Sequence, residues 1–404
     1  QDDDANGTDA VADESTIATT CDDGRIILDN GLLRAIIAPD GTVRSLIDLD
    51  NGHELVPDGS GIGHYELLRD EPYEWDAWDI QRDAFLSAEG IDDSHVERVT
   101  ETKRGGATVH VSSTTDGVSI DACITLRAKS KSLEFRTKVD WRASERFLKV
   151  DIPMAIQADR AQYECQYGMV ERPIQKNTRS DEAKYESCTH RFVRVADAGY
   201  AAAVVNASTY GSDVSPIHRN TASGPVRGTM IRLSLLSSPL YPDPNTDKGV
   251  HEFAWNVVAD ASMPAVLDEA NRLNAAVLPA MPAFDPLAQL NPVDGVMVLD
   301  WVKLADDGSG DLILRVYEAV GGEAHARLAV NAALGKATVR ECSIMEDARL
   351  DAELPAAFAD GDPSVARTAQ GAMLSLHPFQ LATLRVSCGS DGGNTDGNES
   401  GSLR

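Results

Sequence analysis

The sequence predicts an all-β protein built from two sandwiches that follow one another along the chain. Three observations support this prediction. Short runs of residues alternate apolar with polar side chains, as half-buried antiparallel strands do. Turn signals rich in Asn, Asp, Gly and Pro separate these runs. Finally, a proline-rich segment interrupts the pattern at residues 278–286, and a second set of short runs follows it.

The first strands are predicted between residues 25 and 48. The expected runs are Arg25–Asp29, Leu32–Ala38 and Thr42–Asp48. They are separated by Asn30-Gly31 and by Pro39-Asp40-Gly41. Both are hairpin signals, because Asn and Gly tolerate a positive φ.

The alternating pattern continues to residue 277, and it defines a first β domain over residues 21–277. Further strands are expected at Ala107–Ser113, Val118–Arg127, Leu133–Arg142, Tyr200–Asn206, Thr229–Leu236 and His251–Ala259. One window, Ser262–Asn274, predicts an amphipathic helix. Leu267, Ala270 and Leu273 recur there at helical spacing, and Pro264 lies near the start of the window.

The remaining segments complete the predicted organisation. Residues 278–290 are expected to form a linker because prolines break all periodicity there. The second set of strands is expected at Gly295–Lys303, Asp311–Glu318, Glu323–Val330, Thr338–Ser343 and Gln380–Ser387. These runs suffice for one small sandwich over residues 291–388. Residues 1–20 and 389–404 have few large apolar side chains, so we expect a flexible acidic leader and a disordered tail.

Composition excludes several classes of protein. The net charge of −27 repels phosphate backbones, so we expect no nucleic-acid partner. No apolar run approaches the roughly 18–20 residues of a membrane span, and the chain starts without a signal peptide. We therefore expect a cytoplasmic protein with no membrane partner. The six cysteines include no CxxC pair, which argues against a zinc ribbon or a redox motif.

The stretch from Tyr73 to Ile80 holds two tryptophans and three carboxylates between turn-rich segments. An indole offers a flat apolar face that suits the C–H side of a pyranose ring, and carboxylates suit its hydroxyls. The stretch therefore has two interpretations. It forms a platform for a sugar, or its indoles fill the sandwich core while its acids cap a turn. No GxGxxG, P-loop, GxSxG or HExxH motif occurs elsewhere, and no two histidines have metal-ligand spacing.

Five sets of segments carry a further signal. They are Asp29–Arg34 with Pro39–Gly41 and Ser45–Asp48; Pro72–Ile80; Val170–Thr178 with Tyr185-Glu186 and His190-Arg191; Tyr200–Val214; and Arg232–Leu236 with Ser238-Pro239, Pro242–Pro244 and His251–Phe253. Leu312–Glu318 and Leu376–Gln380 add to them in the second domain. In order and spacing, over roughly residues 24 to 388, these segments resemble the C-terminal half of glycoside hydrolase family 38, the α-mannosidases, in their bacterial form.

This resemblance implies a large supersandwich of the galactose mutarotase-like kind, followed by a small β-sandwich. It also implies a retaining, zinc-dependent α-mannosidase that acts on an α-mannoside or oligosaccharide substrate. Family members carry their catalytic aspartates and zinc ligands in an N-terminal α/β domain, which residues 1–24 do not supply. We therefore expect no catalytic residue and no cofactor in this chain, with zinc in the missing domain. The missing catalytic domain and a second copy of the chain are the expected protein partners.

In the intact enzyme this region would brace the active site and contribute to its rim. The candidate rim residues are Tyr65, Trp75, Asp76, Trp78, Asp79, Arg172 and Asn177. For Arg172 the alternative role is an ion pair, and for Asn177 it is a turn cap. Family members tend to read Asn-Thr-Ser-Trp-Asp after the Glu-Arg-Pro stretch. This chain reads Asn177-Thr178-Arg179-Ser180-Asp181 and lacks that indole.

Two other functions stay open from the sequence. The chain could be a free-standing carbohydrate-binding protein that uses its aromatic cluster alone. It could also be a mutarotase-like isomerase, which needs a histidine and a carboxylate that face each other in a cleft. His64 and His190 are the candidate bases for that reaction.

Overall fold

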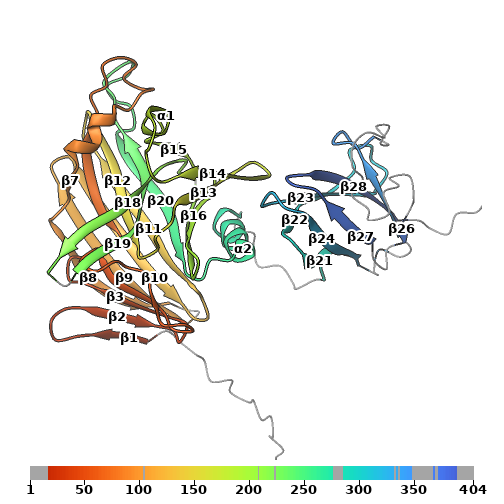
Figure 1. Ribbon diagram of the computed structural model, residues 1–404, viewed down its shortest axis with the longest axis horizontal. Helices are drawn as coiled ribbons and strands as arrows, with labels where there is room; N and C mark the ends of the chain where they lie inside the picture. The colour runs from red at the N-terminus through yellow and green to blue at the C-terminus, as the bar shows by residue number, and fades with distance from the viewer. Residues whose placement is uncertain are drawn as a thin grey trace, which may run out of the picture. The chain divides into compact units, whose positions relative to one another are not determined.

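The computed structural model describes residues 17–102, 105–207, 209–222, 224–275, 285–331, 334, 337–347, 367–368 and 372–388. The chain divides into two compact units, residues 1–165 with 170–276 and residues 166–169 with 277–404 (Figure 1). In the described part, antiparallel strands dominate both units, which confirms the all-β prediction. Neither unit shows, over its described residues, a helix long and apolar enough to cross a membrane.

A five-stranded sheet opens the first unit. Its strands follow chain order: β1 (Ile17–Thr20), β2 (Ile26–Asp29), β3 (Leu33–Ile37), β4 (Val43–Asp48) and β5 (His53–Glu54). The prediction of a flexible leader is wrong for residues 17–20. Their backbone pairs with β2, Ile17 opposite Asp29, although the side chains of residues 18–20 are exposed. Residues 1–16 of that leader lie outside the described residues.

A nine-stranded sheet forms one layer of the sandwich. Its order is β14 (Gly168–Pro173), β13 (Arg160–Cys165), β16 (Phe192–Ala196), β17 (Ala201–Ala207), β20 (Gly249–Val258), β11 (Ser132–Trp141), β10 (Val118–Arg127), β9 (Gly106–Thr115) and β8 (Ser94–Glu101). Strand β8 is an edge strand, and its register against β9 shifts between Val96 and Arg98. Such a shift marks a bulge, which bends the strand locally.

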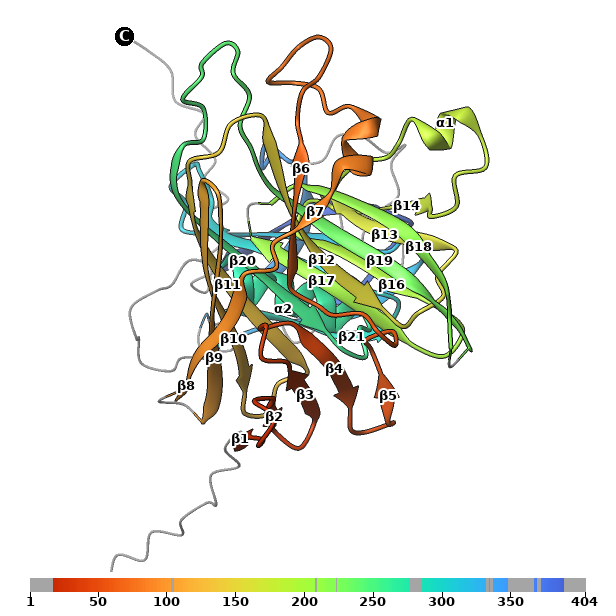
Figure 2. The same ribbon diagram turned by 90° about the vertical axis from the view of Figure 1, so that its left-hand side faces the viewer.

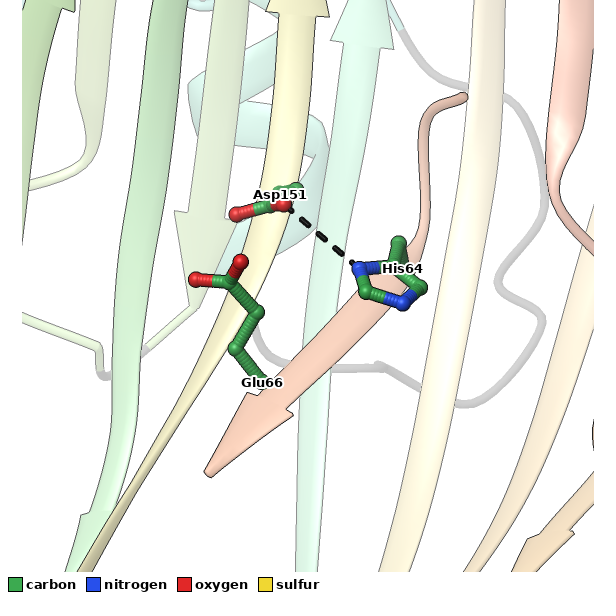
Figure 3. Close-up of side chains that lie close together, drawn as sticks. All are labelled: His64, Glu66 and Asp151. Atoms are coloured by element: carbon green, nitrogen blue, oxygen red, sulfur yellow. Dashed lines mark ion pairs between the residues drawn. The ribbon is translucent and has the colours of Figure 1, made fainter. Parts of the chain in front are cut away.

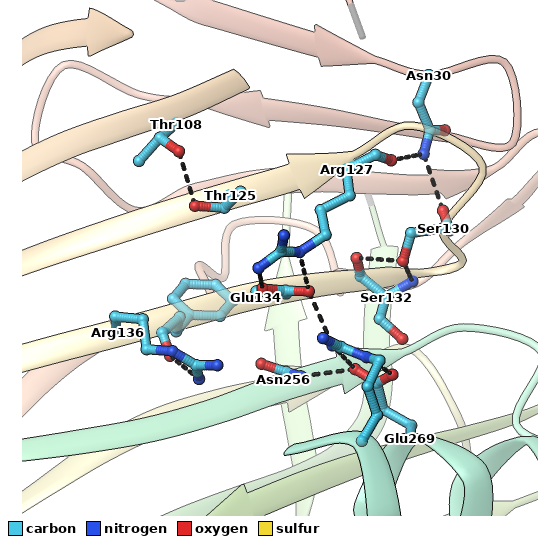
Figure 4. A network of polar contacts seen from close by, with 12 residues as sticks. Asn30, Thr108, Thr125, Arg127, Ser130, Ser132, Glu134, Arg136, Asn256 and Glu269 are labelled. Atoms are coloured by element: carbon cyan, nitrogen blue, oxygen red, sulfur yellow. Dashed lines mark hydrogen bonds and ion pairs between the residues drawn. The ribbon is translucent and has the colours of Figure 1, made fainter. Parts of the chain in front are cut away.

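The helix predicted at Ser262–Asn274 is confirmed as α2 (Met263–Asn274), and it packs on β17 and β20 of this sheet. Its arginine, Arg272, binds Glu269 on the helix and the buried Glu134 of β11. Arg127 of β10 binds the same Glu134 from the other side, 2.6 Å from its carboxylate (Figure 4). A buried carboxylate shared by two guanidinium groups is well compensated, so this network fixes the helix on the sheet.

A six-stranded sheet forms the other layer. Its order is β15 (Ser187–Cys188), β18 (Gly211–Thr221), β19 (Gly224–Ser237), β12 (Arg146–Met154), β6 (His64–Arg69) and β7 (Glu89–Gly90) (Figure 2). The two large sheets share one hydrophobic core. Phe135 and Trp255 stack in that core with ring centroids 3.7 Å apart. The inner faces of the sheets are thus apolar, which leaves the polar side chains of β6, β12 and β19 on the outer face.

Two short helical segments lie outside the sheets of the first unit. A 3₁₀ helix, η1 (Arg82–Ser87), connects the aromatic stretch to β7. Helix α1 (Arg179–Glu182) begins with a capping box in which Thr178 and Asp181 bind each other's backbone N–H groups.

The second unit has its own core between two sheets. One sheet contains β21 (Ala288–Asp294), β24 (Ala324–Val330) and β27 (Ala372–Leu376); the other contains β22 (Met297–Leu304), β23 (Leu312–Glu318), β28 (Leu381–Cys388), β25 (Ala337–Cys342) and β26 (Arg367–Thr368). The predicted linker is wrong for residues 288–290, because they pair with β24 as the start of β21. Residues 278–284 of the linker and the predicted tail, 389–404, lie outside the described residues.

Candidate functional site

A row of charged side chains crosses the outer face of the six-stranded sheet. Cross-strand pairing places His64 opposite Asp151, Asp151 opposite Arg232, and Arg232 opposite Asp213. Alternation along β12 sends the side chains of Val150 and Asp151 to opposite faces. The two-residue period of the strands therefore places apolar side chains in the core and the charged row on the outer face.

At the Asp213 end of this row, each charged side chain has an oppositely charged partner. The ammonium group of the fully buried Lys149 lies 2.9 Å from Glu186 and 2.8 Å from Asp213. Burial raises the pKa of Glu186, and the charge of Lys149 opposes that rise. The Phe85 ring of η1 lies over Lys149, with 5.1 Å between the ammonium nitrogen and the ring centroid. Because each charge has partners, we assign this end of the row a structural role.

The row ends with His64, Glu66 and Asp151, and this end is less well satisfied (Figure 3). His64 Nδ1 lies 3.6 Å from Asp151 Oδ2, and Arg232 lies 3.2 Å from Glu66. The carboxylate of Asp151 raises the pKa of His64, against the effect of burial. Burial raises the pKa of Glu66, and the charge of Asp151 adds to that rise. The sequence singled out His64 but not this group, because the register that joins β6 to β12 is not visible in the sequence.

The aromatic stretch lies on the surface of the first unit. Trp75 is 63% exposed and Trp78 is 81% exposed. Their rings stack, with 5.6 Å between centroids and 13° between planes. The interpretation that both indoles fill the core is therefore wrong, since Trp141 and Trp255 occupy that position. The two rings form an exposed apolar platform.

Asp76 holds this platform to a neighbouring loop. Its Oδ2 accepts hydrogen bonds from the backbone N–H groups of Leu240, at 2.7 Å, and Tyr241, at 2.8 Å. A carboxylate that accepts two N–H bonds restrains both segments, because bonds to a charged acceptor are the stronger kind. Asp79 is exposed and, among the described residues, accepts a hydrogen bond from the next residue, Ile80, at 3.0 Å. Of the two acids, Asp76 sets the loop geometry and Asp79 faces solvent.

The other rim candidates differ from one another in burial and in their hydrogen-bond partners. Tyr65 is buried in the sandwich, where its hydroxyl hydrogen-bonds Thr137 at 2.8 Å and burial raises its pKa to about 12. It is therefore a core residue and offers no surface to a substrate. Arg172 has a buried Nε without a hydrogen-bond partner, and no carboxylate among the described residues forms an ion pair with it. Its alternative role as an ion-pair residue is thus wrong.

Asn177 is exposed and does not serve as the cap of α1, since Thr178 does. The segment after Asn177 makes one contact with the aromatic stretch and one with η1. Tyr185 donates a hydrogen bond to the carbonyl of Ile80, and Arg82 lies 3.4 Å from Glu182. The structure therefore brings the segment that follows Asn177 into contact with the segment that follows Trp78.

Both histidines of the isomerase hypothesis face a carboxylate. His190 lies 3.4 Å from Glu164, but Glu164 also binds Arg191 through several hydrogen bonds and is committed to that pair. A hollow of 60 Å³ reaches His64, which is the volume of about two water molecules and too small for a sugar ring. The geometry does not favour an isomerase.

A larger hollow of 530 Å³ lies on the outer face of the nine-stranded sheet. It is lined by His110, Cys123, Arg136, Lys138 and neighbouring side chains of β8 to β11 and β20. Burial lowers the pKa of His110, whose Nε2 lies 3.0 Å from the Thr100 hydroxyl. The sequence did not reveal this hollow, because alternating polar residues on a strand also describe an ordinary solvated face.

Comparison with known proteins identifies the first unit. A model described as the family 38 C-terminal domain of glycosyl hydrolases matches residues 28–245, which is more than half of the chain. The chain belongs to the C-terminal region of glycoside hydrolase family 38. The second unit matches the family 38 C-terminal beta sandwich domain over residues 297–384. The predicted family is thus confirmed.

Relatives of this family 38 region are named α-mannosidases. The mouse protein alpha-mannosidase 2C1 is 29% identical over 348 residues, which are 80% of this chain and 31% of that protein. The alpha-mannosidase of Saccharomyces cerevisiae is 26% identical over 405 residues, which are 92% of this chain and 36% of that protein. The chain therefore spans about a third of the length of these curated relatives.

A solved structure agrees with the fold. The crystal structure of an alpha-mannosidase from Enterococcus faecalis V583 superposes with a TM-score of 0.63 at 14% identity. The match covers 89% of this chain and 42% of that protein. At this identity the likeness concerns the fold, which is the β architecture of a family 38 C-terminal region.

Proposed function

We propose that this chain is the non-catalytic C-terminal portion of a retaining, zinc-dependent α-mannosidase that hydrolyses terminal α-mannosides. In the intact enzyme it braces the active site and contributes to its rim, while another domain carries the catalytic carboxylates and the zinc. Support comes from the family match and from relatives that are about three times as long. The isolated chain is expected to be inactive.

The observation that carries the rim assignment is the exposed stack of Trp75 and Trp78, held to the loop of Leu240 by Asp76. Two adjacent indole faces exposed to water mark an interaction site, and they suit the apolar face of a pyranose. Asn177 is the other exposed candidate, and the segment after it contacts Ile80 and η1. Tyr65 is removed from the proposed rim because it is buried.

The test uses the full-length enzyme that contains this region. Trp78→Ala should lower kcat/KM on an aryl α-mannoside about tenfold while the melting temperature stays unchanged. Asp76→Ala should also lower kcat/KM, because loss of its two backbone hydrogen bonds releases the platform from the loop of Leu240. Leu86→Ala is the matched control, since Leu86 is exposed on the adjacent η1 but is not part of the stack. Unchanged kcat/KM in both variants would remove the platform from the active-site rim.

A free-standing carbohydrate-binding protein is the alternative function. The 530 Å³ hollow on the nine-stranded sheet is the observation that favours it. A titration of the isolated chain with mannose at millimolar concentration separates the two functions. A rim without its catalytic floor should bind very weakly, whereas a dedicated binding protein should saturate. A cytoplasmic location and self-association stay predictions.

A further inference from the structure

Three side chains of metal-ligand type converge at the end of the charged row. Ligand atoms of His64, Glu66 and Asp151 all lie within 4.8 Å of one another. No other such group of three occurs among the residues that the structure describes. His64 and Glu66 are two positions apart on β6, and Asp151 lies opposite His64 on β12. The sheet register therefore fixes the positions of all three (Figure 3).

Asp151 shows that this group is incomplete. The residue is only 8% exposed, and its Oδ1 is buried without a hydrogen-bond partner in the described structure. Its other oxygen lies 3.6 Å from His64 Nδ1, which is longer than an ordinary hydrogen bond. A buried carboxylate oxygen without a partner is unfavourable, so the position calls for a positively charged or donating ligand.

We propose that His64, Glu66 and Asp151 bind one divalent transition cation. One imidazole and two carboxylates are a ligand set that zinc and manganese accept. Ligand atoms about 2.0–2.2 Å from a tetrahedral ion lie roughly 3.3–3.6 Å apart. The 3.6 Å between His64 Nδ1 and Asp151 Oδ2 lies at the upper end of that spacing, and an ion bound by both carboxylate oxygens would also give the unpartnered Oδ1 a positive partner. Three protein ligands leave a position for water.

The surroundings of the group support this assignment. Arg232 lies beside the group, but its charge is shared with Asp213, 2.9 Å away. Its bond goes to Oε2 of Glu66, which leaves Oε1 available to an ion and orients the carboxylate. Asp92 lies 3.9 Å from His64 Nε2, beyond hydrogen-bond distance, and adds a negative charge beside the group. The bound ion would join strands β6 and β12 on the outer face of the sheet.

The experiment uses the 404-residue chain itself, stripped with a chelator and titrated separately with Zn²⁺ and Mn²⁺. We expect one ion per chain and a rise of the melting temperature with ion concentration. Mn²⁺, followed by electron paramagnetic resonance, excludes binding through the cysteines because manganese prefers oxygen and nitrogen ligands. Since the readout needs no mannosidase activity, its failure is independent of the proposed function.

Variants identify the ligands. His64→Gln, Glu66→Gln and Asp151→Asn should each weaken binding at least tenfold and abolish the thermal shift. His95→Gln and Glu97→Gln are the matched controls, because these residues form an exposed histidine–carboxylate pair 3.8 Å apart without a third ligand. They should bind like the parent chain. Glu66→Gln is the variant at a partly exposed position, so it keeps the test decisive if Asp151→Asn does not fold. The absence of stoichiometric binding, or full binding by His64→Gln, would overturn the proposal.

Discussion

At the scale of single residues, the contribution of a tryptophan to stability depends on whether it is buried or exposed. Trp141 and Trp255 are buried in the sandwich core, and Trp75 and Trp78 are exposed. Trp141→Ala should cost ~3–5 kcal/mol of unfolding free energy, because it leaves a large cavity. Trp78→Ala should change that free energy by less than about 1 kcal/mol. Urea denaturation of both variants measures the difference, and equal losses would contradict the assignment of Trp78 to the surface.

A second residue-scale prediction concerns the buried Asp48. Burial favours its neutral form, but hydrogen bonds from Lys131, at 3.1 Å, and Tyr200, at 2.9 Å, lower the pKa of Asp48 below its usual value. A lowered pKa in the folded state gives stability that is present above about pH 4 and is lost as the pH falls through the folded-state pKa.

Asp48→Asn should therefore cost about 1.5–3 kcal/mol at pH 7, where the charge is lost from the pair. Its stability should also fall less steeply than that of the parent chain as the pH decreases from 5 to 3. Unfolding free energies measured across this range test the prediction. Parallel curves for the two proteins would show that Asp48 does not contribute to acid unfolding.

The cysteines give a third prediction at this scale. Cys342 is buried, and burial raises the pKa of its thiol to about 11, whereas Cys188 is exposed. Since the thiolate is the reactive form, Cys188 should be alkylated within minutes at pH 8, and Cys342 only after denaturation. Peptide mass spectrometry of the alkylated protein distinguishes the two. Rapid modification of native Cys342 would indicate that the second unit opens locally.

At the scale of elements, the hairpin between β3 and β4 depends on Gly41. Gly41 and Gly31 both have a φ of +81°, but only at Gly41 would a Cβ meet a neighbour, 2.2 Å from a methyl carbon of Val111. Gly31→Ala should cost about 1 kcal/mol for the backbone strain alone. Gly41→Ala should cost about 1–3 kcal/mol more, since overpacking adds to that strain. Adding Val111→Ala should restore part of the lost unfolding free energy. If it restores none, the clash with Val111 is not the cause of the destabilisation.

The elements also show how far the sequence could determine the fold. Strand β10 has the predicted bounds, because its buried and exposed residues alternate regularly. Strand β12 was not predicted, since nearly all its residues are buried and a continuous buried run gives no period of two. Tyr65 was misplaced for a related reason. The strand that holds it was not recognised, so the face to which its side chain points was unknown.

The candidate sites were predicted to a different extent. The aromatic stretch could be found from composition, because indoles and carboxylates are adjacent in the sequence. Its exposure could not, since it depends on which strands cover the core. The group of His64, Glu66 and Asp151 requires the register between β6 and β12, which only the folded sheet supplies.

At the scale of the whole molecule, each unit has its own hydrophobic core. Leu384→Ala, in the core of the second unit, should lower the unfolding free energy of that unit by ~2–5 kcal/mol. The melting temperature of the first unit should stay unchanged. Leu233→Ala, in the core of the first unit, should lower only the melting temperature of the first unit. Differential scanning calorimetry resolves the two transitions. A single transition that both substitutions shift equally would show that the units unfold as one.

The bulged strand β8 has a consequence for how the protein behaves when it is concentrated. It ends the nine-stranded sheet, and an edge strand can pair with the edge of another molecule and start a fibre. Here the edge carries His95, Glu97, Arg98 and Glu101, and its bulge interrupts the row of backbone groups. A second molecule would have to bring its own charges against these side chains. The edge therefore protects the chain from fibril growth, a protection that replacing its charges with valine or threonine would remove.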